Sequence, residues 1–232
     1  MPDTAAIDLS HWNQVDDCAA VAGAGVIGVI HKATEGTDYI DPTYDQRRRD
    51  ARDNGLMWGA YHFLRPGDMT MQAQWFVANA QPDPDTLMAA DHEDDGVSLN
   101  DLKQFMSEVA RLIGRPPVLY SGNVIKQQIG NARDEEMAQY RLWLAQYSAT
   151  PSWPTATWPS WWLWQYTGNG SCAGIAGDCD CNAYQGVDLA AEWSGSADAV
   201  IVPDDNVPVI TMAISVPDGV ELHINVNGEA LM

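Results

Sequence analysis

The sequence is poor in positive charge and contains no long apolar run. Only 12 Lys and Arg stand against 32 Asp and Glu, which gives a formal net charge of −20, whereas small soluble domains usually carry a net charge of about 2 to 8. Such a field repels phosphate polyanions and anionic bilayers, so we expect neither nucleic acid nor membrane as a partner. Every apolar run ends well before the roughly 20 residues of a membrane span, so we expect a soluble protein.

Phenylalanine is also scarce, with 3 Phe against 10 Trp and 8 Tyr. Trp and Tyr combine a large apolar face with a polar group, so this excess is more typical of a wet groove than of a dry core. Flat indole faces pack well on sugar rings, although core packing competes for them. We therefore expect one or two members of the Trp cluster to line a groove; the cluster consists of Trp153, Trp158, Trp161, Trp162 and Trp164.

Eight short β-like runs follow one another, at 6–9, 26–31, 57–63, 87–91, 117–120, 142–147, 161–166 and 179–184. Segments of helical length and amphipathic spacing separate the first five, for example at 41–54, 70–80 and 100–114. The last three runs are separated by segments rich in Pro, Gly, Ser and Thr, which are too loop-like for crossover helices. We therefore predict an α/β fold, a small TIM-like (β/α)5(β)3 barrel whose last strands lack full crossover helices.

The chain changes character after Gly195. Two strand-like runs, at 207–216 and 220–226, flank the turn signal Pro217-Asp218-Gly219. We predict a barrel domain over residues 1–195, followed by a linker and a C-terminal β-hairpin over 196–232. An isolated hairpin is marginally stable in water, so we expect it to dock on the barrel or to form a homo-oligomer with a second copy.

Four carboxylates are predicted to meet at one end of the barrel. Active sites of such barrels lie at the carboxyl ends of the strands, where the sequence places Asp8, Asp91, Glu93 and Asp180. In extended chain, Asp91 and Glu93 face the same side, about 6.5 to 7 Å apart. Like charges at that distance raise the pKa of one partner, and glycoside hydrolysis requires such a pair of acid and carboxylate. A solvated acidic loop, continued by the next two Asp residues, is the alternative.

Three histidines suggest a rival site. His31, His62 and His92 lie near three strand ends and, together with Asp8 or Asp180, have the donor types of a metal-dependent hydrolase. No His-x-His or His-Glu-x-x-His spacing supports this, so we predict no metal and no cofactor. We expect the three imidazoles to be hydrogen-bonded members of the wall of the site.

Four cysteines, Cys18, Cys172, Cys179 and Cys181, permit two disulfides in an oxidising compartment, with free thiols as the alternative. Cys179 and Cys181 flank Asp180 and are expected on the opposite face of its strand. Pairing between these two is sterically poor, which leaves Cys172 for one and Cys18 for the other. A zinc site is disfavoured because Cys18 is distant in the sequence.

Seven short motifs follow one another along about residues 5–195. They are Ile7-Asp8-Leu9-Ser10-His11-Trp12, Lys32-Ala33-Thr34-Glu35-Gly36, Gly59-Ala60-Tyr61-His62-Phe63, Asp91-x-Glu93, Leu119-Tyr120-Ser121, Leu142-Trp143-Leu144-Ala145-x-Tyr147 and Trp164-Gln165-Tyr166. In this order they resemble glycoside hydrolase family 25, the Chalaropsis-type lysozymes found among phage endolysins and secreted muramidases.

The resemblance implies an N-acetylmuramidase, which cleaves the β-1,4 bond between N-acetylmuramic acid and N-acetylglucosamine in peptidoglycan with retention. Glu93 matches the general acid/base of the family and Asp91 the carboxylate that supports the transition state. Asp91 either orients the 2-acetamido group of the substrate for internal attack, which forms an oxazolinium, or supports an oxocarbenium directly.

The remaining matches imply substrate contacts. These are Asp8, Asp180, Tyr61, Tyr120, Trp164 and His62. Two features depart from the family pattern: cysteines flank Asp180 where apolar residues are usual, and the hairpin tail has no counterpart in the bare catalytic domain.

Two other functions remain open: a metal-dependent peptidoglycan deacetylase or amidase, and a non-catalytic wall-binding protein. The start of the chain shows no signal-peptide pattern, since residues 1–6 contain no basic segment and Asp8 interrupts the first apolar run. We expect an endolysin that reaches the wall from the host cytoplasm, with a secreted enzyme that has lost its leader as the alternative. The expected partner is the glycan strand of bacterial peptidoglycan.

Overall fold

The computed structural model describes residues 2–195, 210–215, 221–226 and 229–231. The chain divides into two compact units, Met1–Ala199 and Val200–Met232. The predicted linker after residue 195 falls on residues outside the described ranges.

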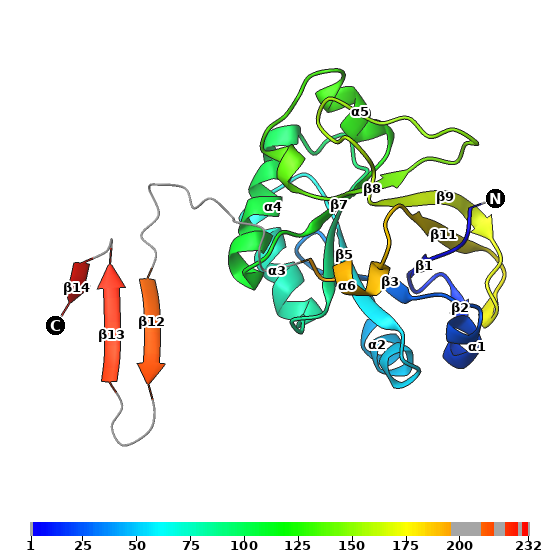
Figure 1. Ribbon diagram of the computed structural model, residues 1–232, viewed down its shortest axis with the longest axis horizontal. Helices are drawn as coiled ribbons and strands as arrows, with labels where there is room; N and C mark the ends of the chain where they lie inside the picture. The colour runs from blue at the N-terminus through cyan, green and yellow to red at the C-terminus, as the bar shows by residue number, and fades with distance from the viewer. Residues whose placement is uncertain (1, 196–209, 216–220, 227–228, 232) are drawn as a thin grey trace. The chain divides into compact units, whose positions relative to one another are not determined.

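Eight strands of the first unit close into a barrel (Figure 1). In order around the barrel they are β1 (Ala6–Leu9), β3 (Gly28–Glu35), β5 (Met57–Phe63), β6 (Leu87–His92), β7 (Val118–Ser121), β8 (Leu142–Ala145), β9 (Leu163–Gly170) and β11 (Cys179–Tyr184). Neighbours from β1 to β9 are parallel, whereas β11 is antiparallel to both β9 and β1. The start of β11 therefore lies at the mouth that is formed by the carboxyl ends of the other strands.

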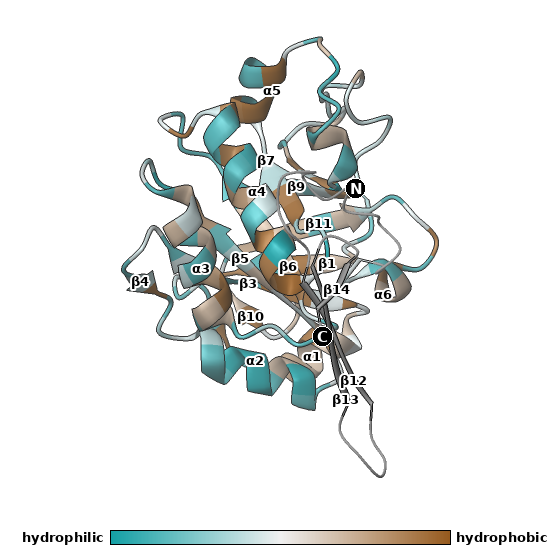
Figure 2. Cartoon of the chain, turned by 90° about the vertical axis from the view of Figure 1, so that its left-hand side faces the viewer, coloured by the Kyte–Doolittle hydropathy of each residue, from teal (hydrophilic) through white to brown (hydrophobic). Residues whose placement is uncertain are grey.

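Helices cover the outside of the barrel. One helix follows each of the first five barrel strands: α1 (Cys18–Gly23), α2 (Tyr44–Asp53), α3 (Met69–Ala80), α4 (Leu99–Ile113) and α5 (Asn123–Ile129). No helix lies between β8 and β11, so the predicted (β/α)5(β)3 barrel is confirmed. Figure 2 shows α2 as hydrophilic along its length, because Arg, Asp and Gln fill it. Among the helices of the described ranges, none combines the length and the apolar character needed to cross a bilayer.

Side chains of each barrel strand alternate between the interior and the helix layer. The end of the barrel opposite the mouth is closed by Trp193, which follows the short helix α6 (Leu189–Glu192). The Nε1 atom of Trp193 donates to the carbonyl of Trp58 (2.8 Å). The ring lies so close to Gly28 that a Cβ atom there would come within 2.4 Å of it. This end of the barrel is therefore filled by side chains.

Short elements complete the first unit: β2 (Gln14–Val15) pairs with β10 (Ile175–Ala176), β4 (Tyr39–Ile40) pairs with β3, and the 3-10 turn η1 (Met137–Gln139) precedes β8. In the second unit, β12 (Ile210–Ser215), β13 (Glu221–Val226) and β14 (Glu229–Leu231) form an antiparallel sheet. The β12–β13 pair confirms the predicted hairpin, and β14 was not predicted. The predicted turn at 217–219 lies outside the described residues.

Candidate active site

The mouth of the barrel contains a polar cavity of about 200 Å³. Its lining consists of Asp8, Tyr61, Asp91, Glu93, Tyr120, Trp143, Tyr147, Gln165 and Asp180. All four carboxylates that the sequence singles out are present. The strands bring them together because each lies at an inward-facing position or in the loop that follows one.

Asp91 is the last inward-facing residue of β6, and Glu93 follows it in the loop. Asp91 is only 5% exposed, and its Oδ1 atom has no hydrogen-bond partner in the described part of the chain. Burial, and then the charge of Glu93, raise the pKa of Asp91 well above its usual range. Glu93 is exposed as a residue, yet the protein surrounds its carboxyl group enough to raise its pKa as well. The pair can thus retain a proton toward neutral pH.

Asp8 accepts hydrogen bonds on both carboxylate oxygens. The Nε2 atom of Gln165 donates to Oδ1 (3.0 Å) and Oδ2 (2.9 Å), and Nδ2 of Asn182 donates to Oδ2 (2.8 Å). Asn182 is itself held by Nε1 of Trp143, which donates to its Oδ1 atom (2.6 Å). Burial and the charge of Asp180 raise the pKa of Asp8 to about 8, although the donated hydrogen bonds act in the opposite direction. The cavity therefore carries fewer than four negative charges at neutral pH.

Two tyrosines orient the amide of Gln165. The hydroxyls of Tyr120 (2.9 Å) and Tyr147 (2.7 Å) both donate to its Oε1 atom. Because Oε1 accepts both hydroxyl hydrogens, the amide NH2 group is turned toward Asp8. This network fixes one wall of the cavity before a ligand arrives.

Asp180 lies directly opposite Asp8 in the β1–β11 ladder. Burial and the charge of Glu93 raise the pKa of Asp180 to about 6. The antiparallel direction of β11 is what brings this residue, near the start of its strand, to the mouth. Cys179 and Cys181 lie in the core outside the barrel wall, on the face opposite to Asp180, as predicted.

A second cavity, of about 360 Å³, adjoins the first. The two share Glu93, Tyr120 and Tyr147, and the second continues over Asn123 and Gln146 beyond the ends of β7 and β8. Glu93 thus stands at the boundary between two hollows.

The three histidines face the helix layer and do not line either cavity, contrary to the prediction. His62 is fully buried on the outer face of β5, where its ring nitrogens hydrogen-bond Thr34 Oγ1 (2.7 Å) and Gln72 Oε1 (3.2 Å). His31 is equally buried, and His92 has no partner for either ring nitrogen in the described part of the chain. Burial lowers the pKa of all three to about 4, so they are neutral. Within the described ranges, no group of three or more His, Cys, Asp or Glu residues is arranged to hold a metal ion.

Trp164 also lies outside both cavities. It is 8% exposed in the outer core, and its Nε1 atom donates to the carbonyl of Gln146 (2.7 Å). Gln165, one residue further along β9, is the one that points inward. No member of the predicted Trp cluster lines either cavity, whereas Trp143 lines the first.

The sequence prediction missed Gln165, Trp143, Tyr147 and Asn182 as parts of the site. The first three stand inside motifs that carried the family resemblance. Asn182 lies two residues after Asp180 and so shares its face of the strand. A spacing of two residues from a predicted site residue in a strand was therefore the sequence signal that could have identified Asn182.

Neither of the two possible disulfides is present; the alternative of free thiols holds for all four cysteines. The thiols of Cys172, Cys179 and Cys181 each donate to a main-chain carbonyl one or two residues away, at 3.6 to 3.7 Å. Cys18 begins α1. These thiols pack as small apolar groups in the wall behind the cavity.

Known proteins match this chain in sequence and in structure. The model of glycosyl hydrolases family 25 matches residues 7–175. Lysozyme M1 of Streptomyces globisporus is 28% identical over 197 residues, which cover 78% of this chain and 67% of the relative. The N,O-diacetylmuramidase of Chalaropsis sp. is 28% identical over 198 residues, 75% of this chain and 94% of that protein. The structure of a bacterial lysozyme from Streptomyces coelicolor superposes with a TM-score of 0.73 at 29% identity, over 82% of this chain and 96% of that one.

Proposed function

The chain belongs to glycosyl hydrolase family 25, and from this premise we propose that it is a muramidase that hydrolyses peptidoglycan between N-acetylmuramic acid and N-acetylglucosamine with retention. The supporting observation is the position of Glu93. It stands between two hollows, beside the buried carboxyl of Asp91, with its pKa raised. An acid in this position reaches a bond between two sugars that occupy the two hollows.

In the first step, protonated Glu93 transfers its proton to the glycosidic oxygen as the bond from the anomeric carbon to that oxygen breaks. The acetamido oxygen of the same sugar attacks the anomeric carbon and closes an oxazolinium ring. Asp91 accepts a hydrogen bond from the N–H of that acetamido group, and its negative charge balances the positive charge that grows on the ring. Within the described residues its Oδ1 atom has no hydrogen-bond partner, which supports this role, because a buried carboxyl oxygen without a donor gains strongly when a donor or a positive charge arrives.

In the second step, the carboxylate of Glu93 removes a proton from a water molecule, and the resulting oxygen nucleophile attacks the anomeric carbon and opens the ring. The bond forms on the face that the leaving sugar has vacated, so the configuration is retained. Asp8 and Asp180 bind hydroxyl groups of the sugar in the cavity.

The proposal is tested by analysing the products of purified peptidoglycan digested at several pH values. We expect new reducing muramic acid ends, with activity that falls as pH rises through the raised pKa of Glu93, because the acid form is then lost. Glu93→Gln should abolish product formation with an unchanged unfolding temperature. The matched control is Asp95→Asn, an exposed acid in the same loop, which should retain activity.

The same digestion separates the rival functions. New free amines would indicate a deacetylase or amidase, and chelator sensitivity would accompany them if a metal took part. Binding without any product would indicate a wall-binding protein. Either result would remove the muramidase assignment.

Two finer predictions belong to this proposal. A role as a phage endolysin predicts that the protein, made inside a susceptible bacterium, lyses the cell only when a membrane-permeabilising protein is made with it. Association through the C-terminal sheet predicts a dimer in sedimentation that becomes a monomer when residues 196–232 are removed.

A further inference from the structure

Trp12 differs from the other tryptophans of the chain. Its side chain is 86% exposed, whereas each of the other nine Trp residues is buried or partly buried. Trp carries one of the largest apolar surfaces among the side chains, so an exposed indole offers a large flat face to a ligand. The ring of His11 covers part of Trp12, at 4.4 Å between ring centroids, and leaves the rest of the indole free.

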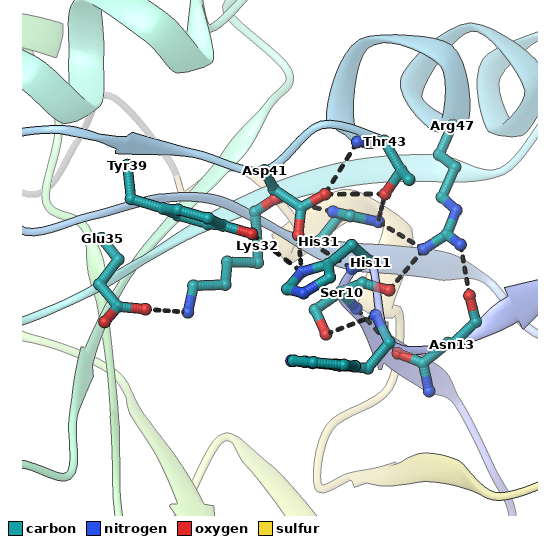
Figure 3. Close-up of polar contacts among 11 residues, drawn as sticks. Ser10, His11, Asn13, His31, Lys32, Glu35, Tyr39, Asp41, Thr43 and Arg47 are labelled. Atoms are coloured by element: carbon teal, nitrogen blue, oxygen red, sulfur yellow. Dashed lines mark hydrogen bonds and ion pairs between the residues drawn. The ribbon is translucent and has the colours of Figure 1, made fainter.

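The loop that carries Trp12 is held firmly in place. Figure 3 shows Asp41 between His11 and Thr43: its Oδ2 atom accepts from the His11 main-chain N–H (2.9 Å), and Oδ1 accepts from the N–H (2.9 Å) and hydroxyl (2.7 Å) of Thr43. Asp41 is only 2% exposed. These bonds tie the loop after β1 to the start of α2.

Arg47 fixes the two ends of the same loop. Its guanidinium donates to the carbonyl of Ser10 (2.5 Å) and to that of Asn13. The side chain of Asn13 accepts from the main-chain N–H of Ser10 (2.8 Å) and closes the turn. Trp12 is therefore an exposed aromatic on a preorganised loop, and binding to it requires little further ordering of the chain.

A series of contacts connects this loop to the cavity. Lys32 carries the charge that opposes the rise in the pKa of Asp91, and its Nζ atom lies 5.4 Å from the ring centroid of Tyr39. The hydroxyl of Tyr39 is 3.0 Å from Nδ1 of His11, the residue next to Trp12. Trp12 thus lies on the rim of the mouth beside β1 and β3.

The second cavity lies on the opposite side of this mouth. In the order of strands around the barrel, β7 is the fourth from β1 in either direction. The second cavity, beyond β7 and β8, shares Glu93 with the first but none of the other three acids. It therefore suits the leaving sugar, which only the general acid must reach. The sugar that becomes positively charged belongs in the first cavity with Asp91.

We propose that Trp12 is a stacking platform for a pyranose ring of the glycan strand, on the side of the cavity away from the leaving sugar. The strand would cross the mouth from Trp12, through the acidic cavity, to the second cavity. This inference deepens the proposed muramidase function and rests on it. The exposed indole face meets the axial C–H groups of a sugar ring, and the neutral stacking surface suits a protein whose net charge of −20 repels an anionic wall.

The test is binding of peptidoglycan glycan fragments of increasing length to an inactive Glu93→Gln parent by calorimetry. Trp12→Ala in that parent should weaken binding of the longest fragment about tenfold and leave binding of the disaccharide unchanged. Trp12→Phe should restore most of the loss, because the flat ring is kept. In the active enzyme, Trp12→Ala should raise KM and leave kcat unchanged, which is the signature of uniform binding.

The matched control is Val187→Ala, which removes a fully exposed apolar side chain from the segment between β11 and α6, away from the mouth, and should change nothing. If the parent binds long fragments and Trp12→Ala binds them equally well, the platform is overturned and the muramidase function stands. If the parent binds no fragment and the wild-type enzyme releases no muramic acid ends, both are overturned.

Discussion

Near the mouth, the side chains of consecutive residues on a barrel strand point to opposite sides of the barrel wall. Asp91 faces the cavity with its pKa raised by burial and by Glu93, whereas His92, the next residue, is enclosed by the helix layer with its pKa lowered to about 4. Tyr61 and His62 form a second such pair. Burial favours the neutral form on both sides, but only the inner side groups ionisable residues around an open hollow. Chemistry is therefore confined to one face of each strand.

The largest difference in the effect of a substitution is expected between Asp91 and His92. Asp91→Asn should lower kcat/KM by roughly 10²- to 10³-fold, because the carboxylate that balances the developing charge is lost. His92→Phe should keep activity within about threefold. It should not lower the unfolding temperature, because it removes two buried nitrogens that have no partner among the described residues. Steady-state kinetics and thermal unfolding check both. A severe kinetic defect in His92→Phe would break the separation of the two faces.

A second contrast concerns Gln165 and Trp164. Gln165→Leu removes one of the two side-chain donors to Asp8 and the acceptor of the hydroxyls of Tyr120 and Tyr147, so we expect activity to fall about tenfold or more. Trp164→Phe loses one hydrogen bond in the outer core, which should cost about 1 kcal/mol of stability with activity unchanged. Equal kinetic losses in the two variants would contradict this division.

The pH dependence of stability is expected to differ between variants of Asp180 and of Cys172, a buried thiol behind the cavity. The folded pKa of Asp180, about 6, exceeds that of an unfolded Asp, so the native state binds more protons and its stability falls as pH rises toward and through 6. Asp180→Asn removes this effect. The unfolding temperature of Asp180→Asn minus that of the wild-type protein should therefore increase by about 2 to 4 °C when the pH is raised from 4 to 7.

Cys172→Ala serves as the control for that measurement. The thiol of Cys172 is buried and its pKa is raised by burial, so it stays neutral between pH 4 and pH 7. The variant should lower the unfolding temperature by a constant amount across that range. A pH-dependent difference in the control would mean that the slope does not come from Asp180.

The smallest expected effect is that of a reducing agent. Because all four thiols are free, dithiothreitol should leave the unfolding temperature unchanged. Alkylation of the unfolded, unreduced protein should label four cysteines by mass spectrometry. Fewer labels would show that a disulfide forms in solution.

Much of the fold and of the site could be predicted from the sequence. The eight runs gave the strands in order, and the Pro- and Gly-rich segments showed where crossover helices are missing. The Asp91-x-Glu93 spacing placed both acids at one cavity because alternation is a local property of extended chain. His62 and Trp164 were misplaced for the same local reason, since a shift of one residue exchanges the two faces of a strand.

By itself the sequence determined the barrel, its family and the place of Asp8, Asp91 and Glu93 at the mouth, because these depend on periodicity and on motifs only a few residues long. The tertiary structure alone decided the direction of β11, the outward turn of the histidines and the separation of the thiols. It also decided how the tyrosines fix Gln165 against Asp8 and how Asp41 and Arg47 hold Trp12 at the rim. Each of these depends on contacts between segments far apart in the chain, and short-range sequence patterns carry no information about such contacts.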